Sequence, residues 1–239
     1  MIRPGYKSES THAISSYKQI GKVTAGFALA GFGTEPTYGE ISDDSMKMTV
    51  DYAAHHIQVI LGELVEKEFE DLKFAGDMIS RKMKKLNDSL CYINRRIGRG
   101  NYLAGTICYI AGENFICLPF GGGYACLWDM EKVTPLTNKA VPDGDTRYIW
   151  DALGGCLDWK VDFDTGTIPV GTQLICATSA PPAQVLEKEL GYLTHIDPTI
   201  VSGKIHDVLA VESDIPAAVL SLNQAVPGEE EDNDTETDA

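Results

Sequence analysis

The sequence predicts an α+β domain in which the sheet lies inside and the helices lie outside. The 239-residue chain is 44% hydrophobic and 23% charged, which is the composition of one ordinary globular domain. Segments with the apolar pattern of strands stand near both ends of the chain and in its middle. Two segments with the three- and four-residue apolar steps of helices separate the first strands from the middle ones. This order of strands and helices indicates the α+β class.

The first elements are two strands followed by two helices. The strands cover residues 13–17 and 23–30, and Gly31 ends the second. The first helix runs from residue 44 to about 67, where apolar residues keep a helical spacing at Met46, Val50, Ala53, Ile57, Leu61 and Leu64. The second shows the same spacing at Met78, Met83, Leu86, Leu90 and Ile93. Both helices are therefore predicted to be long and amphipathic.

The middle of the chain is predicted to be a meander of antiparallel hairpins. Its strands are residues 103–111, 115–118, 124–128 and 133–136, with turns at 112–114 and 129–131. The glycines 121–123 are interpreted as a further hairpin turn. A polar stretch around 142–145 follows, and then come a strand at 173–177, helices at 183–190 and 200–211, and a closing strand at 217–222.

The chain is expected to form one domain, residues 1–223, with an acidic tail at 224–239. The tail has almost no apolar content, and seven acids lie between Gly228 and Ala239. Such a segment buries too little apolar surface to offset its ordering entropy, so it is predicted to be disordered.

The charge balance excludes some classes of partner. Twenty Lys and Arg against 35 Asp and Glu give −15, and removing the seven tail acids leaves −8. A surface this acidic repels nucleic-acid phosphates and anionic membranes. No apolar run reaches the roughly 18 residues of a membrane span, and a cytoplasmic location is expected. Six isolated cysteines without a C-x-x-C pair are interpreted as buried free thiols in a reducing compartment.

Simple motifs identify no enzyme. Gly31 and Gly33 lack the third glycine of a dinucleotide loop, and residues 121–123 lack the Lys-Ser/Thr of a phosphate loop. His55 and His56 are adjacent, whereas two metal ligands on one helix need a spacing of four. The remaining histidines, His12, His195 and His206, have no local pattern of a catalytic triad.

Several segments of the chain resemble, in the same order, the motifs of one known protein family. Residues 27–33 look like a strand ending in an Asp-Gly-Met-Gly-Gly-type loop, and residues 38–42 look like a Gly-Glu-x-Ala-Ser helix start. Residues 104–127 are similar to a strand, a Gly-Asp-Ser-Arg turn and a second strand, and residues 135–137 to a sequel ending in Leu-Thr. Further on, residues 151–154, 173–180 and 213–220 look like Arg-Ala-Leu-Gly, a strand leading into Asp-Gly-Leu, and the closing Arg-Asp-Asn strand. From about residue 13 to 223, the sequence thus resembles the metal-dependent protein phosphatases of the PPM (type 2C) family.

The resemblance implies a four-layer αββα sandwich of two antiparallel sheets flanked by helices. Active members hold two Mg²⁺ or Mn²⁺ ions in a carboxylate site that activates a water. Gly31, Gly122 and Ser179 stand where three of those aspartates are expected, and only Asp214 matches a metal-ligand position. The family's early Arg and Asn-Glu-Asp segment has no counterpart, with Glu9 the nearest carboxylate. One aspartate cannot compensate the dehydration of two divalent ions.

The resemblance therefore implies a pseudophosphatase, a divergent family member that acts as a binding or regulatory module in cytosolic signalling. Asp214 is then a vestige of the metal site, no cofactor is expected, and the partner is another protein or a phosphoprotein. The alternative is an active, divergent Ser/Thr phosphatase that uses Mn²⁺ or Mg²⁺ and recruits Asp43, Asp44 or Asp151 to a rearranged site.

A third possibility is an Ntn-type hydrolase, which has the same layering. Thr24 would be its nucleophile only after removal of residues 1–23. An intact mass that begins at Met1 or Ile2 excludes this hypothesis.

Overall fold

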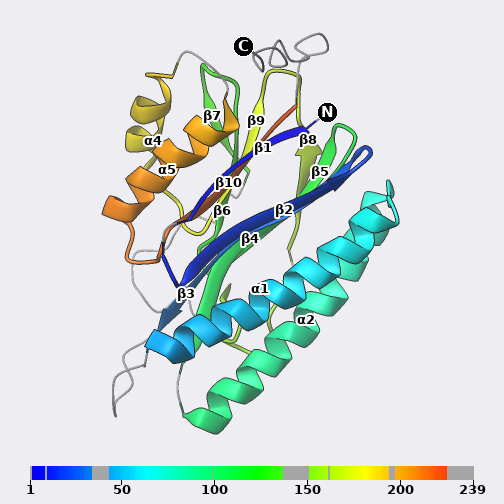
Figure 1. Cartoon of the computed structure of the whole chain (residues 1–239), viewed down its shortest axis with the longest axis vertical. Coiled ribbons are helices and arrows are strands. Elements are labelled where there is room, and N and C mark those ends of the chain that lie inside the picture. Colours follow the sequence, from blue (N-terminus) through cyan, green and yellow to red (C-terminus); the bar gives the residue numbers. More distant parts are fainter. Residues whose placement is uncertain are drawn as a thin grey trace, which may run out of the picture.

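The chain forms two five-stranded antiparallel sheets between two layers of helices, as the computed structural model in Figure 1 shows. The structure describes residues 2–8, 10–33, 43–98, 100–136, 151–160, 162–193 and 197–224. The predicted helix start at 38–42, Glu9, the polar stretch at 142–145, His195 and the tail from residue 225 lie outside the described residues. Within them, the α+β class and the αββα layering are confirmed.

One sheet, called here the β3 sheet, has the strand order β2-β3-β4-β5-β8. Its strands are β2 (Ala13–Ile20), β3 (Val23–Gly33), β4 (Asn101–Ala111), β5 (Asn114–Phe120) and β8 (Asp164–Thr167). The long helices α1 (Asp43–Glu66) and α2 (Leu72–Ile97) cover its outer face (Figure 1).

The other sheet, the β10 sheet, has the order β1-β10-β9-β6-β7. Its strands are β1 (Ile2–Ser8), β6 (Tyr124–Trp128), β7 (Val133–Pro135), β9 (Gln173–Ala177) and β10 (Ala218–Gln224). Helices α4 (Ala183–Leu190) and α5 (Pro198–Glu212) cover it on the opposite side of the molecule (Figure 1). Strand β10 ends at Gln224, the first residue of the predicted tail.

Local sequence explains where two of the helices begin. The Asp71 carboxylate accepts hydrogen bonds from the backbone N–H groups of Lys73 and Phe74 at 2.9 and 3.1 Å, which caps α2. Asp197 caps α5 in the same way through Thr199, at 2.7 Å. Gly98 ends α2 with a φ of 63°, a conformation that favours glycine.

Each interface between layers has its own apolar core. Ile57 of α1 and Met83 of α2 belong to the cluster that joins the long helices to Tyr109 on the β3 sheet. Phe115 and Leu220 lie between the two sheets. A further cluster joins α4 and α5 to the β10 sheet. No helix among the described residues is long and apolar enough to cross a membrane.

The predicted single meander is wrong, because its strands belong to two sheets. The β4–β5 hairpin lies in the β3 sheet, and the β6–β7 hairpin lies in the β10 sheet. The glycines 121–123 therefore carry the chain from one sheet to the other and do not close a hairpin. Gly121 and Gly122 have φ values of 61° and 89°, and a Cβ on Gly123 would lie 1.9 Å from the Gly105 carbonyl oxygen.

Two strands, β1 and β8, were not predicted. Both are sheet edges, and their sequences, Ile-Arg-Pro-Gly-Tyr-Lys-Ser and Asp-Thr-Gly-Thr, contain few apolar residues. An edge strand needs less apolar surface than a central one, so the periodicity that reveals buried strands is missing here.

Candidate functional site

The four positions that the resemblance assigns to metal-binding aspartates lie at one end of the sandwich. Gly31 ends β3 and pairs with Leu103, and a Cβ on Gly121 would lie 2.7 Å from the Leu103 carbonyl oxygen. Gly122 stands in that same turn before β6. Ser179 follows β9, and Asp214 precedes β10, the strand that pairs with β9. The structure thus brings the loops carrying these residues together.

The space beside Gly31 is filled by helix α1. A Cβ at this position would lie 2.5 Å from the Met46 sulfur and 2.7 Å from a methyl carbon of Val50. Both side chains are buried. The Gly31 N–H donates to the His12 carbonyl oxygen at 2.8 Å, which fixes the strand end under the helix. A carboxylate at Gly31 would therefore meet apolar side chains where the resemblance expects metal ions.

Ser179 is hydrogen-bonded to the turn that precedes β10. Its hydroxyl lies 2.9 Å from the Ser213 hydroxyl, and Ser213 Oγ accepts the backbone N–H of Ile215 at 3.1 Å. The adjacent Thr178 hydroxyl donates to the Pro216 carbonyl oxygen at 3.0 Å. These bonds tie the end of β9 to the turn before β10 through neutral groups. Asp214, in that turn, is exposed to solvent.

The segment that begins at Asp151 is held against helix α2. The Asp151 carbonyl oxygen accepts the Gly121 N–H at 3.0 Å and the indole N–H of Trp159 at 2.9 Å. Asn87, buried on α2, donates to the Cys156 carbonyl oxygen at 2.8 Å and accepts the Gly154 N–H at 2.9 Å. These hydrogen bonds fix the backbone of the segment against α2 and against the turn at Gly121.

The described residues at this end do not fit a two-metal carboxylate site. Two of the four positions have no side chain, one carries a neutral hydroxyl, and one carries an exposed aspartate. No group of three or more His, Cys, Asp or Glu with an arrangement that could hold a metal occurs in the described ranges. Mg²⁺ and Mn²⁺ are bound through oxygen ligands, and a site for two such ions needs carboxylates that converge on them. The interpretation of Asp214 as a vestigial ligand stays a prediction.

The residues proposed for the alternative enzymes belong to three segments: the start of α1, the segment that begins at Asp151, and strand β3. Asp44 is exposed in the first turn of α1, and Asp43 begins that helix. Thr24 is buried within β3, where it pairs with Gln19. Its hydroxyl has no hydrogen-bond partner among the described residues.

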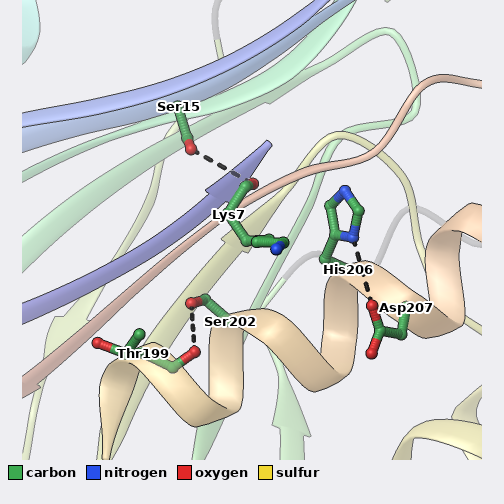
Figure 2. Close-up of polar contacts among 6 residues, drawn as sticks. All are labelled: Lys7, Ser15, Thr199, Ser202, His206 and Asp207. Carbon is green, nitrogen blue, oxygen red and sulfur yellow. Dashed lines mark hydrogen bonds and ion pairs between the residues drawn. The ribbon is translucent and has the colours of Figure 1, made fainter. Parts of the chain in front are cut away.

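His206 is a buried residue of α5 beside β1, as Figure 2 shows. Its Nδ1 lies 3.6 Å from an Asp207 carboxylate oxygen and has no hydrogen-bond partner in the described part of the chain. The nearby hydroxyls donate to backbone carbonyl oxygens: Ser202 to Thr199 at 2.9 Å, and Ser15 to Lys7 at 3.4 Å (Figure 2). The described contacts therefore contain no Ser–His pair of a triad.

The cysteines are free thiols, and all but the half-buried Cys156 are buried, as predicted. Burial raises the pKa of Cys126 to about 12 and also raises the pKa of Cys117. A thiol is a poor nucleophile in its protonated form, so these residues are packing groups of the core.

Solved structures with a similar architecture identify the fold. The serine/threonine phosphatase of S. agalactiae superposes with a TM-score of 0.70 at 10% identity, over 93% of this chain and 99% of that chain. The catalytic domain of the phosphatase PstP, solved with two manganese ions, gives 0.63 at 13% identity, over 93% of this chain and 97% of that chain. The chain has the PPM phosphatase fold.

A third structure with this fold, RsbX in complex with magnesium, gives a TM-score of 0.55 at 13% identity over 93% of this chain and 94% of that chain. No family model matches the sequence, and no curated protein matches it significantly. The chain therefore has this fold at 10–13% sequence identity to these three proteins.

The sequence predicted the positions that correspond to the family's metal ligands. It did not predict that Met46, Val50 and Ser213 lie beside them. Met46 and Val50 were expected only as core residues of a helix. Ser213 carried no signal, because its partner Ser179 is 34 residues away in sequence. Only the three-dimensional packing of α1 on the end of β3 reveals that the place of a carboxylate is filled.

Proposed function

We propose that this chain is a divergent member of the PPM family that has lost metal-dependent hydrolysis and acts as a binding or regulatory module. The observation that carries the proposal is the closure of the position beside Gly31 by Met46 and Val50. The hydrogen bond between Ser179 and Ser213 supports it, because a neutral hydroxyl pair replaces a second carboxylate.

The chemistry of hydrolysis explains why this loss is decisive. Bulk water has a pKa far above neutral, and a bound metal ion lowers the pKa of that water to about 7. Without that ion, no hydroxide is available at neutral pH to attack a phosphoryl group. No metal cofactor is therefore proposed for this chain, although the structures of PstP and RsbX contain manganese and magnesium.

The proposed setting is cytosolic signalling, with another protein or a phosphoprotein as the partner. The free, mostly buried thiols suit a reducing compartment. The net charge of −15 disfavours nucleic acid and anionic membranes as partners.

The test is a phosphatase assay on the full chain and on Asp214→Ala. The substrates are p-nitrophenyl phosphate and a phosphothreonine peptide, each with Mn²⁺ and with Mg²⁺, and an active PPM phosphatase is the positive control. Both forms of the chain are expected to give equal rates at background. Turnover that Asp214→Ala abolishes would establish a rebuilt metal site and the active phosphatase instead.

A further inference from the structure

A groove of about 420 Å³ lies between α1 and α2. Tyr52, His55, His56 and Val59 of α1 line one side, and α2 contributes Lys82 and Lys85. The lining includes none of Gly31, Gly122, Ser179 and Asp214, and the groove belongs to the helical layer that covers the β3 sheet. The two helices run side by side in opposite directions (Figure 1).

An apolar stripe of α1 borders this groove and is open to solvent. Val59 is 46% exposed, Tyr52 39% and Met48 70%. Their spacing of four and seven residues places them on one face of the helix. The Tyr52 ring also packs on the His56 ring, with centroids 4.2 Å apart. Exposed apolar side chains aligned on one helix face beside a groove are typical of a surface that another molecule covers.

The same groove is basic, although the chain is strongly acidic. Helix α2 holds seven of the 20 Lys and Arg residues and only two acids, Asp77 and Asp88. The described residues of the lining include two lysines and two histidines and no acid. Lys82 is paired with Glu63 at 2.6 Å, and this contact lowers the pKa of Glu63. Lys85 forms no ion pair with a described residue, so its charge is available to a partner.

We propose that this groove docks an amphipathic helix of a partner protein, with apolar side chains against Tyr52 and Val59 and acidic side chains beside Lys85. A groove between two helices accepts a third helix by interdigitation of side-chain ridges. The inference rests on the proposed function and names the partner class of that binding module.

Two other occupants fit less well. Nucleic acid would face a net charge of −15 and an apolar stripe. A second copy docked symmetrically would bring the same lysines of both copies toward each other, since a two-fold interface pairs identical patches. An acidic helix complements both the charge and the apolar stripe.

The experiment uses two labelled 18-residue helical peptides and fluorescence anisotropy with the full chain. Both peptides carry leucines with the same helical spacing, flanked by glutamates in one and by lysines in the other. We expect the glutamate peptide to bind and the lysine peptide not to bind. Lys85→Glu should weaken binding by about fivefold or more, because it reverses a charge at the contact. Val59→Glu should weaken it by about tenfold or more, because it places a charge in the apolar contact.

Matched controls separate the groove from a general charge effect. Lys84→Glu is the control for Lys85→Glu, because it reverses the charge of an exposed lysine of α2 outside the lining. Val211→Glu is the control for Val59→Glu, because it replaces an exposed valine of α5. Both should bind the glutamate peptide within about twofold of the unchanged chain. Val211 lies on the helical layer of the opposite side of the molecule, and Lys84, although adjacent to Lys85, faces a different direction on the helix and does not line the groove. Circular dichroism confirms that each variant is folded.

Three results would overturn the inference: no binding of the glutamate peptide, equal binding of the lysine peptide, or equal weakening by Lys84→Glu and Lys85→Glu. A dimer of the unchanged chain that Val59→Glu dissociates would overturn it as well and assign the surface to a second copy. These outcomes are independent of the phosphatase assay. Hydrolysis would refute the proposed function and leave the peptide measurement intact, whereas failed binding with background hydrolysis would refute only this docking site.

Discussion

At the scale of one residue, Gly31 lies in close packing against helix α1. Met46 and Val50 occupy the volume that any side chain at this position would need. Val50 is branched at Cβ and has little rotamer freedom in a helix, so α1 must shift to admit even one methyl group.

Gly31→Ala should therefore destabilise the chain by about 1–3 kcal/mol, the usual cost of overpacking a core. The matched control is Gly203→Ala in α5, where nothing lies within 4 Å of the added Cβ. That change should stabilise by up to about 1 kcal/mol, because alanine favours the helix. Urea unfolding of both variants measures the difference. An unchanged stability of Gly31→Ala would show that α1 leaves room for a side chain, which would remove the main support for a lost metal site.

The sequence alone indicated the positions at which the aspartates expected from the resemblance are absent. The segments around Gly31, Gly122 and Ser179 could be aligned with a family pattern, because local order and spacing survive divergence. The Met46 contact could not be predicted, since helical periodicity identifies a buried face without identifying what it packs against. The same limit applies to the groove of α1 and α2. The concentration of lysines in one helix is visible in the sequence, but its neighbour across the groove is not.

At the scale of elements, Tyr109 joins strand β4 to the turn between the long helices. Its buried phenol donates to the Phe69 carbonyl oxygen at 2.7 Å, next to the end of α1. Burial raises the pKa of Tyr109 to about 12. In the unfolded chain this group titrates near 10, so the folded state keeps its proton to a higher pH.

This shift predicts a loss of stability in alkali. The raised pKa of Tyr109 adds to the free energy of unfolding in full below the unfolded-state pKa of about 10. This added stability disappears as the pH rises toward about 12. The stability advantage of the unchanged chain over Tyr109→Phe should therefore shrink by on the order of 2 kcal/mol between these pH values. Urea unfolding of the two proteins at about pH 8, 10 and 11.5, which lie below this window, at its start and near its end, tests it. A constant difference at all three would show that the phenol has no raised pKa.

The elements themselves were largely predictable and the resemblance implied two sheets, but the distribution of the strands between the two sheets was not predictable. The buried strands stand out as short apolar runs, and the long helices show apolar steps of three and four residues. The partition of β4–β5 and β6–β7 between two sheets depends on the close approach of Gly123 to Gly105, a contact between segments that are separate in sequence. Strand β1 depends on its pairing with β10 at the far end of the chain. Such long-range pairings leave no local signal.

At the scale of the whole molecule, the stability of the sandwich comes from its apolar layers. Apolar clusters fill all three interfaces between the four layers. The end that carries Gly31, Gly122, Ser179 and Asp214 is closed by apolar packing beside Gly31 and by neutral hydrogen bonds beside Ser179. The fold is thus expected to be complete without a metal ion.

The thermal midpoint of the full chain should therefore be the same, within about a degree, in millimolar Mn²⁺ and in EDTA. A ligand present at 100 times its dissociation constant stabilises the folded state by about 2.7 kcal/mol. For a chain of this size, that would raise the midpoint by roughly 5–10 °C. Calorimetry detects such a shift easily, and Asp214→Ala serves as the comparison. A midpoint that rises with Mn²⁺ in the unchanged chain and not in Asp214→Ala would mean that Asp214 still coordinates an ion. An equal midpoint in all four samples would leave Asp214 as an exposed residue of the turn before β10, with no energetic link to a metal.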